Sequence, residues 1–500
     1  MKRLLLRVLR RSIPSGSIAE QSIKSGIWMT GIKVLNRVFQ LLMLIVLARL
    51  LAPRDFGLMG IALLTLAGIK GFTDIGINAA LIHDKRENID SYLNTVWCLE
   101  AGRGLLLFLI LFFSAPYIAA FFGEPVATDL IRVIGLTPLV YGLRNPAVVY
   151  FRKDLAFHKE FAYQTSGGLV QFLVGVGYAL FSPTVWALVF AFLSTEVART
   201  SLSYVMHGYR PWPRFRWDAA AELIDYGKWI TASSIVYYLY SKGDDAFVGW
   251  YLSATALGFY QYAYQLADAP SSEISETISS VTFPAYSKLQ DNPSRLREAF
   301  LATTRFTAFL TVPMAFGIAL ITPSFVPVVL GDEWLPMVLT MQLLALYGLL
   351  HALTRNFGSI WKAVGRPDII TKLGLIRVVC IAIFIWPATA RWGIEGTAFV
   401  VVAVYFFPLL PLDVYFVSKF THVAVVDVFR EFWYPFVAGT TMFGVLWVAL
   451  LFVDVPAIVE LIILIPAGAV VYAGAAFVLD HRFNWGIRGN LESIVKGVMS

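Results

Sequence analysis

The chain has 500 residues, of which 58% are hydrophobic and 15% are charged, and its mean hydropathy is +0.69. A soluble globular protein carries roughly 25% charged residues, so most of this chain is expected to be embedded in lipid. No polar block is long enough to form a water-soluble catalytic domain. The two cysteines, Cys98 and Cys380, lie in apolar segments, and nothing indicates a disulfide framework.

The N-terminal segment, MKRLLLRVLRRS, alternates basic and apolar residues. It has no continuous apolar core of the length that a secretory signal needs. Two interpretations fit: an amphipathic helix on the cytoplasmic membrane surface, or a disordered basic tail.

Long apolar segments follow one another along the rest of the chain. A membrane-spanning helix needs about 20 mainly apolar residues, and fourteen segments fit this requirement. They cover residues 25–48, 56–82, 92–115, 126–148, 159–181, 183–206, 229–252, 255–283, 299–323, 334–358, 369–389, 393–417, 432–453 and 456–479.

One stretch of the chain recurs, which indicates an internal repeat. Residues 26–60 match residues 227–261 without a gap, at an offset of 201 positions. Five positions are identical, with Gly26, Trp28, Thr30, Leu51 and Gly57 recurring as Gly227, Trp229, Thr231, Leu252 and Gly258. Six helices per copy is an even number, so both copies enter the membrane from the same side, as in parallel-repeat transporters.

The repeat predicts the domain organisation. Residues 1–206 form an N-lobe with the N-terminal arm and six helices, and residues 207–418 form a C-lobe that repeats it. Residues 419–500 add a helix pair and a cytoplasmic tail. The expected fold is therefore an all-α membrane protein with two parallel six-helix lobes around a central cavity.

Lysine and arginine indicate the orientation of these helices. With the N-terminus inside, the inner segments hold 26 of the 40 basic residues, and the outer segments hold three, Arg49, Arg54 and Arg391. The net charge of +7 thus reflects a multi-pass protein of the cytoplasmic membrane with both termini in the cytoplasm, rather than a nucleic-acid-binding surface.

Three passages resemble the bacterial oligosaccharide-lipid flippases of the Wzx type, within the multidrug/oligosaccharidyl-lipid/polysaccharide exporter superfamily. They are residues 47–85, 282–300 (TFPAYSKLQDNPSRLREAF) and 329–350 (VLGDEWLPMVLTMQLLALYGLL). The resemblance implies alternating access around a cationic cavity. It also implies a polyprenyl-diphosphate-linked oligosaccharide as cargo, moved to the outer leaflet for surface polysaccharide assembly. Membrane lipid and the polysaccharide polymerase and export machinery are the further partners it implies.

A polar stripe on the first helix is the strongest candidate for cargo contact. Lys33, Asn36, Arg37 and Gln40 have the spacing of one helix face. Lys33 and Arg37 lie about 12 and 18 Å inside the membrane edge at 1.5 Å per residue, with no acid within four positions. A charge at that depth costs about 2.5–3.5 kcal/mol in lipid. A diphosphate is one possible partner, and an ion pair with Asp74 or Glu100 is the alternative.

Other charges inside the predicted helices are second-rank candidates. Lys70, Asp74 and Arg103 extend the proposed cationic cavity of the N-lobe, although Lys70–Asp74 and Glu100–Arg103 also have the spacing of packing ion pairs. Lys242 and Arg377 are the candidates from the C-lobe.

The matching helix of the second copy is built from other residue types. Tyr237 and Tyr238 suit sugar rings but equally suit a membrane belt. Asp244 and Asp245 fit either ion coupling, with Asp74 as a further candidate, or charge balance with Lys242.

Signatures of an enzyme are missing from the sequence. It contains no Walker loop, no HExxH and no metal-spaced Cys/His cluster, so we expect no catalytic residue, no metal and no cofactor. Two alternatives to the flippase remain: an ion-coupled multidrug exporter of the same superfamily, and a membrane glycosyltransferase or polymerase that uses polyprenyl-linked sugar.

Overall fold

The computed structural model describes residues 18–73, 90–154, 156–452, 455–483 and 485–486. These residues form helices and turns, with no strand among them. They divide into two compact units, one of residues up to 242 together with 249–258, the other of residues 243–248 together with 259 onward. The all-α prediction is confirmed.

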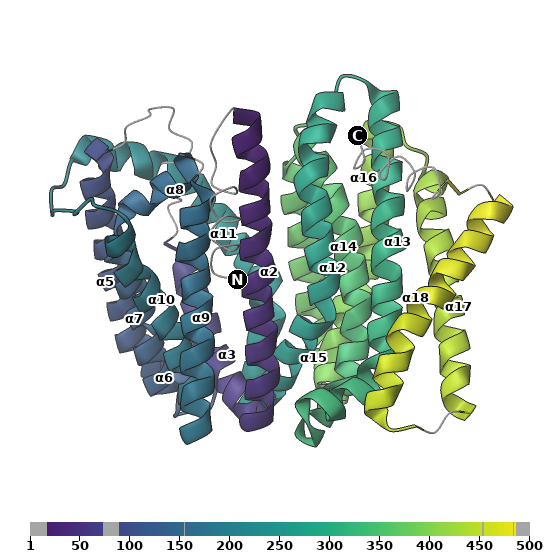
Figure 1. Cartoon of the computed structure of the whole chain (residues 1–500), viewed down its shortest axis with the longest axis horizontal. Helices are drawn as coiled ribbons and strands as arrows, with labels where there is room; N and C mark the ends of the chain where they lie inside the picture. The colour runs from purple at the N-terminus through teal and green to yellow at the C-terminus, as the bar shows by residue number, and fades with distance from the viewer. Residues whose placement is uncertain (1–17, 74–89, 155, 453–454, 484, 487–500) are drawn as a thin grey trace, which may run out of the picture. The chain divides into compact units, whose positions relative to one another are not determined.

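Unit 1 contains the helices coloured purple to blue in Figure 1 and most of α11. Its elements are α2 (Ile18–Leu50), α3 (Pro53–Gly71), α5 (Asp90–Phe121), α6 (Ala127–Ile134), α7 (Leu136–Gly142), η1 (Pro146–Val149), α8 (Tyr150–Lys153), α9 (Phe157–Phe181), α10 (Trp186–Met206) and α11 (Trp217–Tyr251).

Unit 2 contains the helices coloured teal to yellow in Figure 1, and α12 belongs to it from Phe259 onward. Its elements are α12 (Ala254–Leu289), α13 (Pro293–Phe325), η2 (Val326–Leu330), η3 (Asp332–Met337), α14 (Val338–Ala363), α15 (Asp368–Val404), η4 (Tyr405–Leu409), α16 (Leu410–Thr421), α17 (Val425–Phe452) and α18 (Ala457–Phe483).

The long helix α15 is two antiparallel helices joined by a tight turn. Trp392 and Gly393 have non-helical backbone angles, and Gly393 has a φ of 57° that favours glycine. Across the turn the hydroxyls of Thr389 and Thr397 lie 2.8 Å apart. The turn therefore separates the predicted spans 369–389 and 393–417.

Helical structure is present at each of the fourteen predicted spans. Seven segments of the described chain are long and apolar enough to cross a membrane by length and composition alone. One of them, residues 368–421, contains the two antiparallel helices of α15. The protein is thus a multi-pass helical membrane protein, and the number fourteen stays a prediction.

The recurring glycines lie at one close helix crossing. A methyl group added at Gly57 would overlap the carbonyl oxygen of Ala254, and one added at Gly258 would overlap that of Pro53. Both contacts are related by the same offset of 201 positions, since Pro53 corresponds to Ala254 and Gly57 to Gly258. The starts of α3 and α12 therefore cross symmetrically, and only a residue without a side chain fits at either position.

The start of α3 is fixed by local chemistry. Pro53 occupies its first turn, where a missing N–H costs nothing. The carboxylate of Asp55 accepts a hydrogen bond of 3.1 Å from the backbone N–H of Ala52. These two residues determine where α3 begins and so place Gly57 at the crossing.

The last two helices pack on the rest of unit 2 through a common apolar core. Buried Ala308, Val312 and Ala315 of α13 meet Ala438 and Met442 of α17 in that core. Tyr472 of α18 donates a hydrogen bond of 2.9 Å to the carbonyl of Phe309. The helix pair thus belongs to unit 2. The predicted lobe boundary at 206/207 stays a prediction, because α11 contributes to both units.

Candidate functional site

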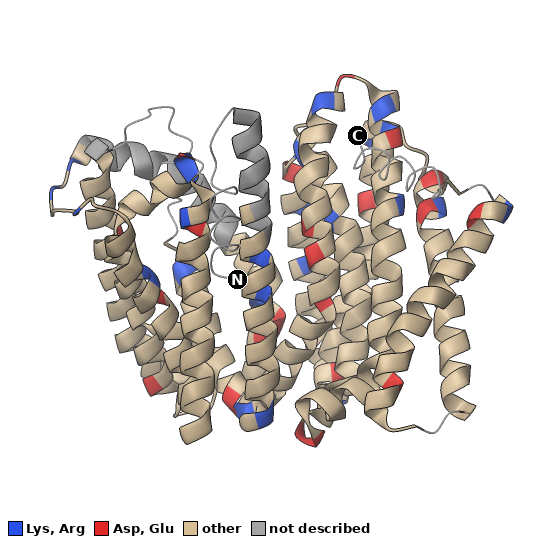
Figure 2. Cartoon of the chain, in the orientation of Figure 1, with Lys and Arg blue, Asp and Glu red and all other residues tan. Residues whose placement is uncertain are grey.

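The polar stripe of α2, Lys33, Asn36, Arg37 and Gln40, is covered in part by α9. Lys33 and Gln40 are exposed, and the Arg37 guanidinium donates a hydrogen bond of 2.9 Å to the Gln40 side chain. Asn36 instead lies against α9, where its Oδ1 would meet a methyl group at Gly168 at 2.6 Å. Figure 2 shows blue segments near the middle of α2, within a mostly tan ribbon. Lys33, Arg37 and Gln40 therefore remain the candidates for an anion.

Aromatic packing sets this orientation of α2. The ring of Trp28 contacts that of Phe161 at 5.0 Å, and the ring of Phe39 stacks on that of Phe172 at 6.1 Å. Because α9 covers this side of α2, the cationic residues lie on the side that α9 leaves open.

Lys70 and Arg103 belong to a cluster of mixed charge inside unit 1. The Arg103 guanidinium lies 3.4 Å from the Glu100 carboxylate and donates a hydrogen bond of 3.3 Å to the Thr73 hydroxyl. Lys70 interacts electrostatically with Glu100 and with Glu196 of α10. The structure thus contains the predicted Glu100–Arg103 pair. Asp74, the predicted partner of Lys70, lies outside the described residues.

The two tyrosine candidates differ in their surroundings. The Tyr238 hydroxyl donates a hydrogen bond of 3.0 Å to the carbonyl of Leu64, and its ring lies against Gly68 of α3. Tyr237 is exposed and makes an edge contact with the Tyr240 ring at 5.1 Å. Tyr237 is therefore the one of the two whose ring is open to a ligand, and Tyr238 holds α11 against α3. Lys242 is exposed further along α11.

Asp244 and Asp245 are buried inside unit 2, with 3% and 4% of their surfaces exposed. The carboxylate of Asp244 accepts a hydrogen bond of 2.8 Å from the hydroxyl of Tyr260. Burying a carboxylate costs free energy unless hydrogen bonds or opposite charges compensate. Arg377 supplies part of that compensation, since the two side chains interact electrostatically.

Arg377 is buried among aromatic rings. It donates a hydrogen bond of 2.6 Å to the Tyr405 hydroxyl, and its guanidinium lies 4.5 Å from the centre of the Tyr405 ring. The ring of Tyr347 lies 6.0 Å away. Such stacking is typical of arginine. Arg377 is 4% exposed. Together with Tyr347, Tyr405 and Asp244 it forms an internal polar network of unit 2.

The sequence interpretation missed one polar pair in this network. The imidazole Nδ1 of His351 lies 3.2 Å from a carboxylate oxygen of Asp268, which comes from a different helix. Nothing in the sequence indicated a partner for His351, because Asp268 is 83 positions away. The acidic residues and serines that follow one another from Asp268 onward indicated a polar face on this helix. They did not indicate which residue of another helix contacts Asp268.

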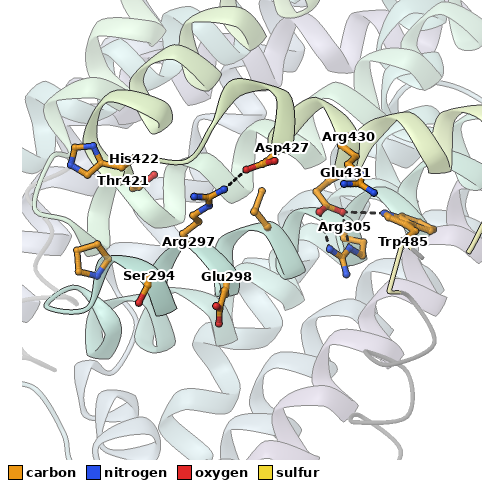
Figure 3. Close-up of a pocket in the computed structure, with 12 residues that line it drawn as sticks. Ser294, Arg297, Glu298, Arg305, Thr421, His422, Asp427, Arg430, Glu431 and Trp485 are labelled. Carbon is orange, nitrogen blue, oxygen red and sulfur yellow. Dashed lines mark hydrogen bonds and ion pairs between the residues drawn. The ribbon is translucent and has the colours of Figure 1, made fainter. Parts of the chain in front are cut away.

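A second missed cluster lines a cavity of about 570 Å³ at one end of unit 2. Figure 3 shows Arg297 facing Asp427, with Arg305, Glu431 and Trp485 grouped beside them. Arg305 donates two hydrogen bonds, of 2.7 and 2.8 Å, to the Glu431 carboxylate, and the Trp485 indole adds one of 3.1 Å. These contacts fasten α13 to α17 and to the segment after α18.

The described residues contain no group of three or more histidine, cysteine or acidic side chains placed to hold a metal ion. The polar side chains described above can therefore contact a ligand through their charges and through hydrogen bonds.

The fold defines a multi-helix membrane protein. The chain aligns with the inward closed conformation of the lipid II flippase MurJ with a TM-score of 0.73 and 13% sequence identity, over 92% of this chain and 99% of that one. At this identity the likeness shows the fold alone.

Sequence comparison then gives the family. Residues 46–339 match the family described as polysaccharide biosynthesis protein, and the chain belongs to that family. It is 28% identical over 363 residues to the lipopolysaccharide biosynthesis protein WzxC of Escherichia coli K12, covering 72% of this chain and 74% of that one. It is also 24% identical over 490 residues to an uncharacterized membrane protein in the cps region of Klebsiella pneumoniae, covering 96% and 99%. The resemblance to Wzx-type flippases is confirmed.

Proposed function

We infer that this chain flips a lipid-linked oligosaccharide across the cytoplasmic membrane for assembly of a surface polysaccharide. The observation that carries this inference is the family match, together with a fold shared with a lipid II flippase over nearly the whole chain. The chain is therefore a transporter and not an enzyme. A polyprenyl diphosphate is the carrier that the cationic residues favour.

The exposed charges of α2 support a diphosphate as the group recognised. Lys33 and Arg37 are one helical turn apart, so both can reach one extended anion. Arginine offers a planar fork to phosphate oxygens, whereas lysine acts as a point charge. The Gln40 side chain, which accepts from Arg37, orients that fork.

The orientation of transport follows from the distribution of basic residues. The excess of lysine and arginine on one side favours cytoplasmic termini. The cargo would then be loaded in the cytoplasmic leaflet, with polymerase and export machinery acting after release outside. The multidrug exporter and the glycosyltransferase are not favoured by the family match.

Substitution of Arg37 tests the proposed function. Arg37→Ala should remove most flipping, because it deletes the guanidinium that would meet the diphosphate. Arg37→Lys should restore part of the activity, since charge returns without the bidentate fork. Arg37→Glu should be worse than alanine because it repels the diphosphate.

Gln40→Ala is the matched control for this series. It removes the hydrogen-bond acceptor of Arg37 but keeps both cations, so flipping should fall less than in Arg37→Ala. Flipping and abundance are measured together in cells and in liposomes that carry cargo from a deletion strain. An Arg37→Ala protein that is abundant and flips at the wild-type rate refutes the phosphate role.

A further inference from the structure

Two neighbouring helices of unit 2, α12 and α14, face each other with paired side chains. A methyl group at Gly348 of α14 would lie 3.1 Å from the carbonyl oxygen of Ala267 and 3.3 Å from the Cα of Asp268, so the two backbones are close. Beside this contact, the ring of Tyr264, one turn before Asp268 in α12, lies 4.8 Å from the ring of Tyr347, which precedes Gly348 in α14.

The Asp268–His351 pair lies next along this contact. Nδ1 of the imidazole faces one carboxylate oxygen at 3.2 Å, and the other carboxylate oxygen accepts a hydrogen bond of 2.6 Å from the Ser272 hydroxyl. The side chains of His351 and Asp268 are 29% and 17% exposed. The pair is therefore held in place by protein and is still within reach of water.

The remaining charged and titratable groups around the pair come from five elements, α11, α12, α14, α15 and η4. The imidazole stacks on Tyr347 of α14 at 5.3 Å and meets Tyr405 of η4 at 6.2 Å. Asp268 also interacts electrostatically with Arg355 of α14, which lies 3.9 Å from Glu276 of α12. Further into the unit, Tyr405 accepts from Arg377 of α15, and the buried acids of α11, Asp244 and Asp245, complete the network.

Histidine is suited to this place because it changes charge near neutral pH. Its unperturbed pKa of about 6.5 falls in the range where carboxylates stay ionised and arginine stays protonated. Four other histidines lie in the described part of the chain, and each is in the first or last turn of a helix or directly after it: His158, His207, His422 and His481. Of the described histidines, His351 alone lies in the middle of a long helix.

We propose that the Asp268–His351 pair binds the proton that couples transport by this chain to a proton gradient. This inference rests on the proposed function, and it identifies the proton gradient as the source of energy for transport. Binding forms an N–H bond at Nε2, which faces away from Asp268, with the proton taken from hydronium. Release returns that proton to water, and no other bond changes.

Protonation alters the charge balance of the whole network. The imidazolium forms an ion pair with Asp268, whereas the neutral imidazole leaves that carboxylate as an added negative charge beside Tyr347 and Tyr405. In a protein interior such a change has a larger effect than in water. The arrangement of α12 against α14 therefore depends on the proton.

His351→Asn tests the coupling without removing the contact. The asparagine amide can take the place of Nδ1 beside Asp268 but cannot bind a proton. The matched control is His422→Asn, at an exposed left-handed position with a φ of 56° that asparagine tolerates. The full-length protein is reconstituted with polyprenyl-diphosphate glycan isolated from a deletion strain, and the distribution of glycan between leaflets is measured.

A pH difference of one unit should shift that distribution by up to about tenfold for one coupled proton. The shift should persist in His422→Asn and disappear in His351→Asn and Asp268→Asn, while all three variants still flip cargo without a gradient. Retention of the shift in His351→Asn overturns the proposal, as does its loss only in an Asp244→Asn/Asp245→Asn variant.

A cargo-free measurement separates this inference from the proposed function. In protein labelled with carbon-13 at histidine, the signal that disappears in His351→Asn should titrate between pH 5 and 8, with a different midpoint in Asp268→Asn. A signal that does not titrate in this range overturns the proposal. A wild-type protein that flips cargo but ignores the gradient overturns the coupling and leaves the proposed function standing. Absence of flipping under every condition contradicts the proposed function, and with it the coupling.

Discussion

The helix crossing at Gly57 and Gly258 makes a sharp prediction about stability. In Gly57→Ala the new methyl group would overlap the carbonyl oxygen of Ala254 and lie 3.1 Å from its Cα. Both are backbone atoms, so no side-chain rotation relieves the overlap. The helices α3 and α12 must move apart at their first turns, although Pro53 and Asp55 fix the first turn of α3.

The size of the effect follows from two opposing terms. Overpacking a close contact costs about 1–3 kcal/mol, and a rigid backbone places this case at the upper end. Replacing glycine by alanine within a helix contributes about 1 kcal/mol in the opposite direction. Gly57→Ala should therefore lose about 2 kcal/mol of stability. Gly258→Ala should lose a similar amount, because its methyl group would overlap the carbonyl oxygen of Pro53.

Gly177→Ala in α9 is the matched control, since a methyl group there would meet no atom within 4 Å. Thermal unfolding of the purified proteins in detergent, with abundance in membranes, gives the comparison. The Gly57→Ala protein should melt several degrees below the control, and the double variant Gly57→Ala/Gly258→Ala should cost less than the sum, because both changes open one crossing. A Gly57→Ala protein that melts with the control would refute the close approach.

Three further predictions concern other parts of the chain. Ser287→Cys, in a background without the native cysteines, should react with an impermeant reagent only from the cytoplasmic side, and labelling from outside intact cells would contradict the two-lobe topology. Glu431→Gln should lower stability by about 1.5–3 kcal/mol, because the half-buried Arg305 guanidinium loses its charged acceptor. Glu298→Gln, at the rim of the same cavity, should change stability little; equal melting temperatures of the two variants would show that the bidentate pair adds no stability. Tyr238→Phe should cost about 1 kcal/mol through the lost hydrogen bond to Leu64, with Tyr237→Phe as the exposed control, and equal unfolding of the two would contradict the packing role.

The positions of the helices could be predicted from the sequence alone. Apolar segments of membrane-spanning length and their turn residues depend only on local composition, and helical structure is present at every one of them. The repeat was also visible, because the same backbone crossing demands glycine in both copies. The side of α2 that bears Lys33 and Arg37 followed from the helical period, since residues three and four apart share a face.

Only the tertiary structure decided which faces meet. The helical period places Asn36 and Gln40 on one face of α2, but only the packing shows that α9 covers Asn36 and leaves Gln40 exposed. The partners of buried charges come from distant helices, with 83 positions between Asp268 and His351 and 126 between Arg305 and Glu431. A charge in a membrane must be compensated, so the sequence signals that a partner exists. Which residue compensates it depends on how the helices pack, and no local pattern encodes that choice.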